Sequence, residues 1–342
     1  MAASQGERNV VGGPYFEDFE VGQIFDDAPS LTLTSGHAAV HQALVGDRLR
    51  LPLDAALSTA VTGHDQPLAH PNLVCDVAIG QSTGPSQRVR GNLFYRGLVL
   101  LRPVFIGDTL RTRTEVVGLK QNRAGSGSGL VALRVRTADQ HGEPVLDFWR
   151  CPMIPMRDVD LATGHRDRFE TIPEELDLAP IAASVPSQWC LDAFRTHLPG
   201  PHAGDLAPGA VYSIVGRDTV TSAPELARLT LNIAMTHTDA SAGAHGRRLV
   251  YGGHTIGIAA AQATRAIPNL VTILAWRSCE HTGAVFEGDV LSTELTIVDV
   301  HLVGEDPRHD GGGLVDLRAV VTSEQGGERT PVLDWRFVGL MA

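Results

Sequence analysis

The sequence predicts an α+β protein made of two tandem copies of one domain, in which an antiparallel sheet wraps around a central helix. The chain has 342 residues, which is too many for one ordinary core and suits two. Three segments of the first half recur in the second half in the same order. Each half also contains a helical stretch followed by β-rich runs. We therefore expect a first domain at residues 1–157, a linker at 158–205 and a second domain at 206–342.

The internal repeat is the strongest of these observations. Its first element is an apolar pair followed by a Gly-Asp turn, its second begins Gly-Leu-Val, and its third begins Pro-Val-Leu-Asp. The pairs are residues 103–110 with 284–291, 129–134 with 313–318, and 144–150 with 331–337. Because order and spacing are both kept, the two halves are expected to be paralogous domains.

The expected helices and strands follow from composition and from glycine and proline positions. A helix of small, largely apolar residues begins near Gly253 and ends before Pro268, and its first-half counterpart is 73–82. Such a helix can lie close to a curved sheet, so we expect strands to wrap it. First-half strands are expected at 92–101, 109–118, 130–137 and 145–153, with glycine-rich loops at 121–129 and, in the second half, 304–313.

The segment between the halves, residues 158–205, is rich in proline and lacks strong periodicity. A connection of this length inside a compact protein usually spans part of the structure. We expect an ordered linker that crosses the back of the two sheets.

The charge balance excludes one class of partner. The chain carries 28 basic and 39 acidic residues, a net charge of −11, which argues against nucleic-acid binding. Lys120 is the only lysine, so any contacts with phosphate groups fall to arginine side chains.

The cysteines and the hydropathy pattern indicate the cellular compartment of the protein. Cys75, Cys151, Cys190 and Cys279 are far apart in the sequence and form no CxxC pair, so we expect reduced thiols. The N-terminus has no signal-peptide pattern, and no apolar run reaches the ~20 residues of a membrane helix. These features predict a cytoplasmic protein that does not associate with membranes.

A family resemblance rests on three sequence features. Residues 15–23, Tyr-Phe-Glu-Asp-Phe-Glu-Val-Gly-Gln, resemble the opening of MaoC-like domains, and each half carries the Gly-Asp turn that such domains place before a strand. The second half contains His237 five positions after Asn232, followed by Asp239. This spacing resembles the working motif of the family, in which an acidic residue normally occupies the position of Asn232. The chain therefore resembles the double hot-dog MaoC-like hydratases, most closely the mesaconyl-thioester hydratases and a mycobacterial-type double hot-dog group.

The first half carries only part of this motif. Asp47, between Gly46 and Arg48, resembles the acidic residue, but Pro52 stands where His is expected. The resemblance implies that this half serves as a scaffold and as a wall of the acyl-binding site.

The resemblance implies an enoyl-thioester hydratase, a hydro-lyase that needs no cofactor. His237 would take a proton from water that Asn232 holds, and the backbone N–H groups of Gly252 and Gly253 would bind the thioester carbonyl. Because Asn232 cannot ionise, a second acid/base role falls on His237 alone or on a carboxylate. Asp239 is the first candidate for that carboxylate and Asp47 the second.

Several further residues have both a functional and an ordinary interpretation. Asn232 and the paired glycines also suit simple turns. Arg247 and Arg248 could contact coenzyme A phosphates or be solvated. Tyr251, His254 and His281 could line the site or act structurally. His37 and His41 have the spacing of a metal pair on a helix, but no further ligands accompany them, so no metal is expected.

Two other functions stay open at this point. A hot-dog thioesterase usually places a carboxylate on the helix, and residues 253–264 contain none. A non-catalytic acyl-thioester-binding protein would keep the pocket without turnover. The sequence does not distinguish coenzyme A from acyl carrier protein as the carrier, and a homodimer is possible.

Overall fold

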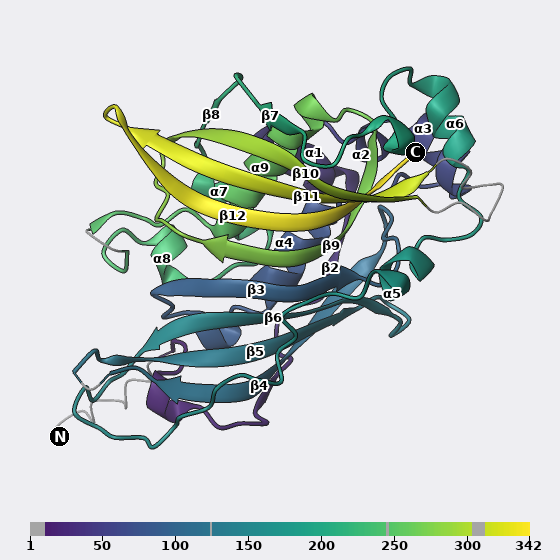
Figure 1. Ribbon diagram of the computed structural model, residues 1–342. Coiled ribbons are helices and arrows are strands. Elements are labelled where there is room, and N and C mark those ends of the chain that lie inside the picture. The colour runs from purple at the N-terminus through teal and green to yellow at the C-terminus, as the bar shows by residue number, and fades with distance from the viewer. Residues whose placement is uncertain (1–10, 124, 244–245, 303–311) are drawn as a thin grey trace, which may run out of the picture.

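The computed structural model describes residues 11–123, 125–243, 246–302 and 312–342. Two antiparallel sheets meet edge to edge, where β3 (Gly91–Leu100) pairs with β9 (Leu270–His281), and form one twelve-stranded sheet. Along it the strands follow the order β1-β4-β5-β6-β3-β9-β12-β11-β10-β7 (Figure 1). The central helices α4 (Pro71–Gln81) and α9 (Gly252–Ala266) contact each other on one side of this sheet. The α+β architecture expected from the sequence is confirmed.

The remaining elements complete the two halves. The other strands are β1 Ile24–Phe25, β2 Leu31–Thr32, β4 Thr109–Gln121, β5 Ser128–Ala138, β6 Pro144–Pro155, β7 Val211–Ser213, β8 Asp218–Thr219, β10 Val290–Leu302, β11 Gly313–Gln325 and β12 Glu328–Met341. The other helices are α1 Ser35–Val45, α2 Arg50–Leu53, α3 Ala55–Thr62, α5 Leu178–Ala183, α6 Leu191–His197, α7 Ala223–Leu229 and α8 Met235–Thr238, with short 3₁₀ turns η1 Phe16–Asp18, η2 Gly84–Ser86 and η3 Ala203–Asp205. All four strands expected in the first half are present as β3 to β6. Most of the loop expected at 304–313 lies outside the described residues.

The two halves repeat individual hydrogen bonds as well as elements. In the Gly-Asp turns, Asp108 accepts from the backbone N–H of Phe105 at 2.8 Å, and Asp289 accepts from that of Phe286 at 3.0 Å. On the central helices, Gln81 donates to the carbonyl of Leu110 and Gln262 donates to that of Leu291. These matching contacts are what a duplicated domain predicts.

Small residues let the helices of the two halves approach closely. An added Cβ on Gly80 of α4 would lie 1.7 Å from the backbone oxygen of Thr230, and one on Gly257 of α9 would lie 2.7 Å from the Val45 side chain. Both positions therefore require glycine for steric reasons. This close packing brings α9 of the second half against elements of the first.

The segment between the halves crosses the face of the sheet opposite to α4 and α9 (Figure 1). The backbones of Arg166 and Lys120 pair in an isolated antiparallel β-bridge. Pro173 lies against Gly97, and Arg277 donates to the carbonyl of Leu176. The chain then forms α5 and α6, whose apolar side chains join a separate core cluster. The division at residues 157 and 205 stays a prediction.

Within the described residues, no helix has the length and apolar character that crossing a membrane demands. The same part of the chain holds no group of three or more metal-binding side chains. His37 instead contacts the hydroxyl of Thr34, and His41 lies 3.3 Å from Asp76. All four cysteines are free thiols.

Candidate active site

A cavity of about 330 Å³ lies between the two halves and receives side chains from both. The second half contributes α8, the loop before α9 and the end of β9. The first half contributes the end of α4 and residues of β3 and β6. The polar lining residues are Thr83, Ser86, Arg90, Asn92, Tyr95, Arg150, Asn232, Thr236, His237, Tyr251, Thr255, His281 and Thr282. None of the described lining residues is a carboxylate.

His237 is oriented in this cavity by a backbone contact. Its Nδ1 lies 2.8 Å from the carbonyl oxygen of Leu249. Because a carbonyl can only accept, Nδ1 carries the ring proton and Nε2 keeps its lone pair. Burial lowers the pKa of His237 to about 4, so the imidazole is neutral at neutral pH. A neutral ring with its Nε2 lone pair free of the ring proton can accept a proton.

Asn232 lines the same cavity and is 4% exposed. Its Oδ1 accepts a 3.0 Å hydrogen bond from the backbone N–H of Ala234. The turn-forming interpretation of Asn232 is therefore present in the structure. That bond also fixes the amide plane and leaves the Nδ2 donors for another partner.

The start of α9 forms another part of the wall. Tyr251 is the N-cap residue and Gly252 is the first helical residue, and both line the cavity. The first N–H groups of a helix have no acceptor within the helix, so they are available to a ligand. Gly253 faces away from the cavity lining, because an added Cβ would lie 1.9 Å from Oδ1 of Asp76. His254 is fully buried outside the lining.

The two carboxylates proposed as acid/base partners are not in the cavity lining. Asp239 is exposed, and its Oδ1 accepts from the backbone N–H and the hydroxyl of Ser241, each at 2.8 Å. The structure therefore gives Asp239 the local role of a turn residue. Asp47 is buried at 3% exposure, and its Oδ1 lies 2.7 Å from Nε2 of His70.

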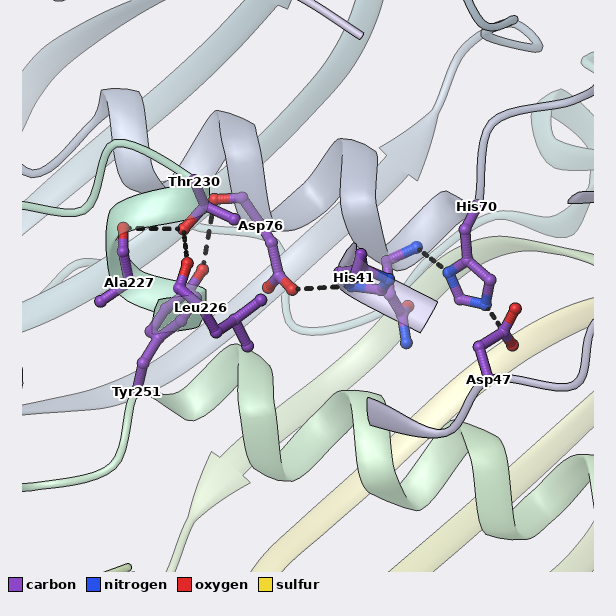
Figure 2. Close-up of polar contacts among 9 residues, drawn as sticks. His41, Asp47, His70, Asp76, Leu226, Ala227, Thr230 and Tyr251 are labelled. Carbon is purple, nitrogen blue, oxygen red and sulfur yellow. Dashed lines mark hydrogen bonds and ion pairs between the residues drawn. The ribbon is translucent and has the colours of Figure 1, made fainter. Parts of the chain in front are cut away.

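Figure 2 shows how the buried acids and histidines near the central helices are paired. His70 accepts from the backbone N–H of Asn72 at Nδ1 and faces Asp47 with Nε2, so both ring nitrogens are engaged. His41 lies 3.3 Å from Asp76. The His41–Asp76 contact joins α1 to α4, and the Asp47–His70 contact joins the segments next to them. Their position agrees with a scaffold role for the first half.

The arginine pair expected at coenzyme A phosphates lies elsewhere. Arg247 stacks on Phe286 at 4.0 Å, and Arg248 forms an ion pair with Glu287 at 2.5 Å. Neither side chain lines the cavity. The arginines that do line it are Arg90, which is exposed, and Arg150, which is 3% exposed.

Sequence reasoning missed Arg150 and Tyr95 and gave His281 only a secondary place. Arg150 donates to the carbonyl of Ser82 and to the hydroxyl of Ser86, both at 2.6 Å, and also bonds Tyr95. The repeat contained a signal for Arg150, because its counterpart in the second half is Phe337. A charged residue in one copy that replaces an apolar one in the other indicates a change of role.

The first half has a counterpart of this cavity at the equivalent place. It is lined by Leu68, Ala69, Pro71 and Val74 before and within α4, and its volume is only about 30 Å³. Pro186 and Trp189 of the linker also line it, and Trp189 is 2% exposed. Residues 186 and 189 therefore occupy part of the space that is open in the cavity between the halves.

Comparisons with known proteins agree with this architecture. The family model described as mesaconyl-CoA hydratase matches residues 7–291. The mesaconyl-CoA hydratase of Cereibacter sphaeroides is 32% identical over 296 residues, which are 84% of each chain. The chain belongs to the mesaconyl-CoA hydratase family. The β-methylmalyl-CoA dehydratase of Chloroflexus aurantiacus is 28% identical over 92% of this chain and 89% of its own.

Solved structures place this family member among double hot-dog proteins. A Mycobacterium tuberculosis protein with a double hot-dog fold, described as essential for survival during infection, is 49% identical, with a TM-score of 0.84 over 96% of this chain and 99% of its own. A putative MaoC domain dehydratase from Chloroflexus aurantiacus has a TM-score of 0.86 at 25% identity, over 98% of this chain and 99% of its own. The double hot-dog prediction and the MaoC-like assignment are confirmed. This member of the mesaconyl-CoA hydratase family is a hydratase or dehydratase of the hydro-lyase class, as the sequence predicted.

Proposed function

We propose that this protein adds water reversibly to a short α,β-unsaturated acyl-CoA whose acyl group carries a second, free carboxylate. The observation that supports this substrate is Arg150, a buried arginine in the lining of the cavity. The relatives named for mesaconyl-CoA and β-methylmalyl-CoA point to the same chemistry, because both of these acyl groups bear such a carboxylate.

Arg150 is a buried cation without an acidic partner among the described residues. Burial lowers the pKa of Arg150, and its hydrogen bonds go to neutral oxygens of Ser82, Ser86 and Tyr95. The carbonyl of Ser82 lies at the C-terminal end of α4, so the helix dipole offsets part of the charge. Its Nε has no partner in the structure. A ligand carboxylate would supply the anion that a buried guanidinium requires.

The size of the cavity favours a short acyl group. Its volume of about 330 Å³ is at the small end of the range for ligand sites. Walls from both halves limit extension of a chain.

The proposed mechanism assigns one role to each group at the cavity. Asn232 donates from Nδ2 to the oxygen of a water molecule, which in turn donates to Nε2 of His237. The water oxygen attacks the β-carbon as His237 removes its proton. Negative charge then develops on the thioester oxygen, where the N–H group of Gly252 stabilises it. Asp239 has no step in this mechanism, because its side chain is exposed and bonded to Ser241.

The proposal also covers the carrier of the acyl group, the contacts with its phosphates, the cellular location and the oligomeric state. Coenzyme A is preferred over acyl carrier protein as carrier because both related proteins are named for CoA thioesters. Arg90, at the exposed rim, is better placed than Arg247 or Arg248 to meet its phosphates. We also keep a cytoplasmic location and a possible homodimer as proposals.

The test compares mesaconyl-CoA with crotonyl-CoA, which lacks the second carboxylate, by following the enoyl-thioester absorbance. We expect the wild type to hydrate mesaconyl-CoA faster. Arg150→Met should lower kcat/KM for mesaconyl-CoA by about 10- to 100-fold, the effect of losing one charge-assisted contact, and should change crotonyl-CoA much less. Because a general loss of structure would affect both substrates, their ratio reports recognition of the carboxylate.

Binding and hydration are also measured with His237→Gln and with the wild type. His237→Gln should still bind mesaconyl-CoA and should not hydrate it. If the wild type binds enoyl-CoA without turnover, the protein is an acyl-thioester-binding protein. Release of free coenzyme A would instead indicate a thioesterase. An Arg150→Met variant with an unchanged substrate ratio would refute the carboxylate assignment.

A further inference from the structure

Hydration of an enoyl thioester requires two proton transfers. One proton leaves the water that attacks the β-carbon, and one proton reaches the α-carbon. None of the described lining residues is a carboxylate that could carry out one of these transfers. The lining does contain a second imidazole, that of His281, which the mechanism above does not use.

His281 is the last residue of β9 and lies beside the start of α9. An added Cβ on Gly252 would lie 2.5 Å from its Nε2, so the ring is in contact with the Gly252 backbone. That Nε2 is buried and has no hydrogen-bond partner in the structure. An unpaired buried ring nitrogen is costly, and one that lies in a cavity lining is available to a ligand.

The position of His281 puts its ring near the α-carbon of a bound substrate. The backbone N–H of Gly252 is the proposed donor to the thioester oxygen, and the α-carbon is bonded directly to the same carbonyl carbon. A ring that touches Gly252 is therefore close to where the α-carbon would lie. His237, oriented by Leu249 and close in sequence to Asn232, belongs to the water site instead.

We propose that His281 is a second catalytic residue, which carries the proton to and from the α-carbon while His237 carries the proton of water. This inference rests on the proposed hydratase function. Its counterpart in the first half is Leu100, so the second imidazole distinguishes the working half from the scaffold half.

The proton balance of the reaction closes with both rings neutral at the start and at the end. His237 takes the water proton as the C–O bond forms at the β-carbon and the π electrons move to the thioester oxygen. That proton passes from His237 to His281, directly or through a water molecule. The enolate then forms its α-carbon–hydrogen bond with the proton of His281, and dehydration runs through the same steps in reverse.

The charges of the two rings agree with a single shared proton. Burial, and then the neighbouring His237, lower the pKa of His281 to about 4. A proton on one ring therefore disfavours a proton on the other. One proton can move between them without both rings being charged at once.

The test separates the α-carbon step from the water step. Methylsuccinyl-CoA and butyryl-CoA are saturated and cannot lose water, but their α-hydrogens can exchange with deuterium in D₂O, as mass spectrometry would measure. We expect exchange with the wild type and with His237→Gln. His281→Gln and His281→Asn should exchange about 100-fold more slowly, the usual contribution of one general acid/base, while binding the same thioesters. His301→Gln, at an exposed histidine outside the cavity, is the matched control.

Each other outcome has a defined meaning. Exchange that survives in both His281 variants, or that disappears in His237→Gln, would overturn the assignment. A wild type that hydrates mesaconyl-CoA without exchanging the α-hydrogen of either analogue would overturn it as well. A wild type that hydrates no enoyl-CoA would refute the proposed function, which the hydration assay reports separately from exchange.

Discussion

Nε2 of His70 lies 2.7 Å from Oδ1 of Asp47, and this buried pair occupies in the first half the region where the second half has Asn232 and His237. Asp47 and Asn232 each stand three residues before a four-residue helix, α2 or α8. His237 lies on α8, whereas Pro52 lies on α2. The first half therefore has an acidic residue at the position of Asn232 and a proline at that of His237, and the acidic residue is paired with His70.

Removal of the Asp47 charge should destabilise the fold. Both partners are at least 96% buried, and loss of one side of a buried hydrogen bond to a charged group costs about 1–3 kcal/mol. We expect Asp47→Ala to lower the free energy of unfolding by about this amount in urea titrations. Asp65→Ala, at an exposed position, should change it little. A small effect of Asp47→Ala would show that the pair contributes no net stability.

The same pair should make stability depend on acid pH. Burial raises the pKa of Asp47, but the charge and hydrogen bond of His70, the Leu49 backbone N–H and His41 together outweigh it and lower the pKa below its usual value of 3.8. A carboxyl with a lowered folded-state pKa stabilises the fold above its unfolded pKa, and this contribution is lost as pH falls through the folded value. Between about pH 5 and 2, wild-type stability should therefore fall more steeply than that of Asp47→Asn.

Hydration should keep its rate down to unusually low pH for a histidine base. Burial lowers the pKa of His237 to about 4, and only the neutral ring can accept the proton of water. We expect kcat/KM for mesaconyl-CoA to be level through neutral pH and to fall below about pH 5. Short pH-jump assays would separate this effect from acid unfolding. A decline centred near pH 6.5 would show that the imidazole is solvated in the working enzyme.

The neighbouring glycines at the start of α9 should respond differently to alanine. A methyl group on Gly252 would lie 2.5 Å from Nε2 of His281, whereas one on Gly253 would lie 1.9 Å from the Asp76 carboxylate. Gly252→Ala should therefore reduce kcat strongly with a small loss of stability, since the displaced ring borders the cavity. Gly253→Ala should lower the melting temperature, because overpacking in a buried contact typically costs about 1–3 kcal/mol. Thermal unfolding and kcat measured on both variants would test this contrast.

The overall architecture was accessible from the sequence because duplication leaves a linear signal. The segments 103–110 and 284–291 carry the same Gly-Asp turn, and in the structure Asp108 and Asp289 make the same backbone contact. His237 and Asn232 were identified because their motif is contiguous. Their meeting in one cavity required no information from the other half.

The rest of the site was not accessible because it depends on contacts between distant segments. Arg150 reaches the cavity only because β3 and β9 join the two sheets at their edges. Asp239 follows His237 closely in sequence, but α8 ends at Thr238 and the chain turns outward, so its side chain bonds Ser241. Arg248 is paired with Glu287, a partner that spacing could not indicate. Differences between the repeated copies, such as Arg150 against Phe337, were the signal that could have been used.

Trp189 should be important for stability but not for catalysis. Its indole is 2% exposed and lines the small counterpart cavity together with the nearby Pro186 and with Pro71, which is far from it in sequence. Trp189→Ala would empty this position, and such a change in a core typically costs about 3–5 kcal/mol. Below its melting temperature the variant should hydrate mesaconyl-CoA at the wild-type rate, because Trp189 does not line the catalytic cavity. Trp149→Ala, which removes a partly exposed indole beneath Arg134, is the matched control and should cost less. Urea titration together with kcat/KM would check both expectations, and a Trp189→Ala variant of normal stability would show that the linker does not fill the counterpart cavity in solution.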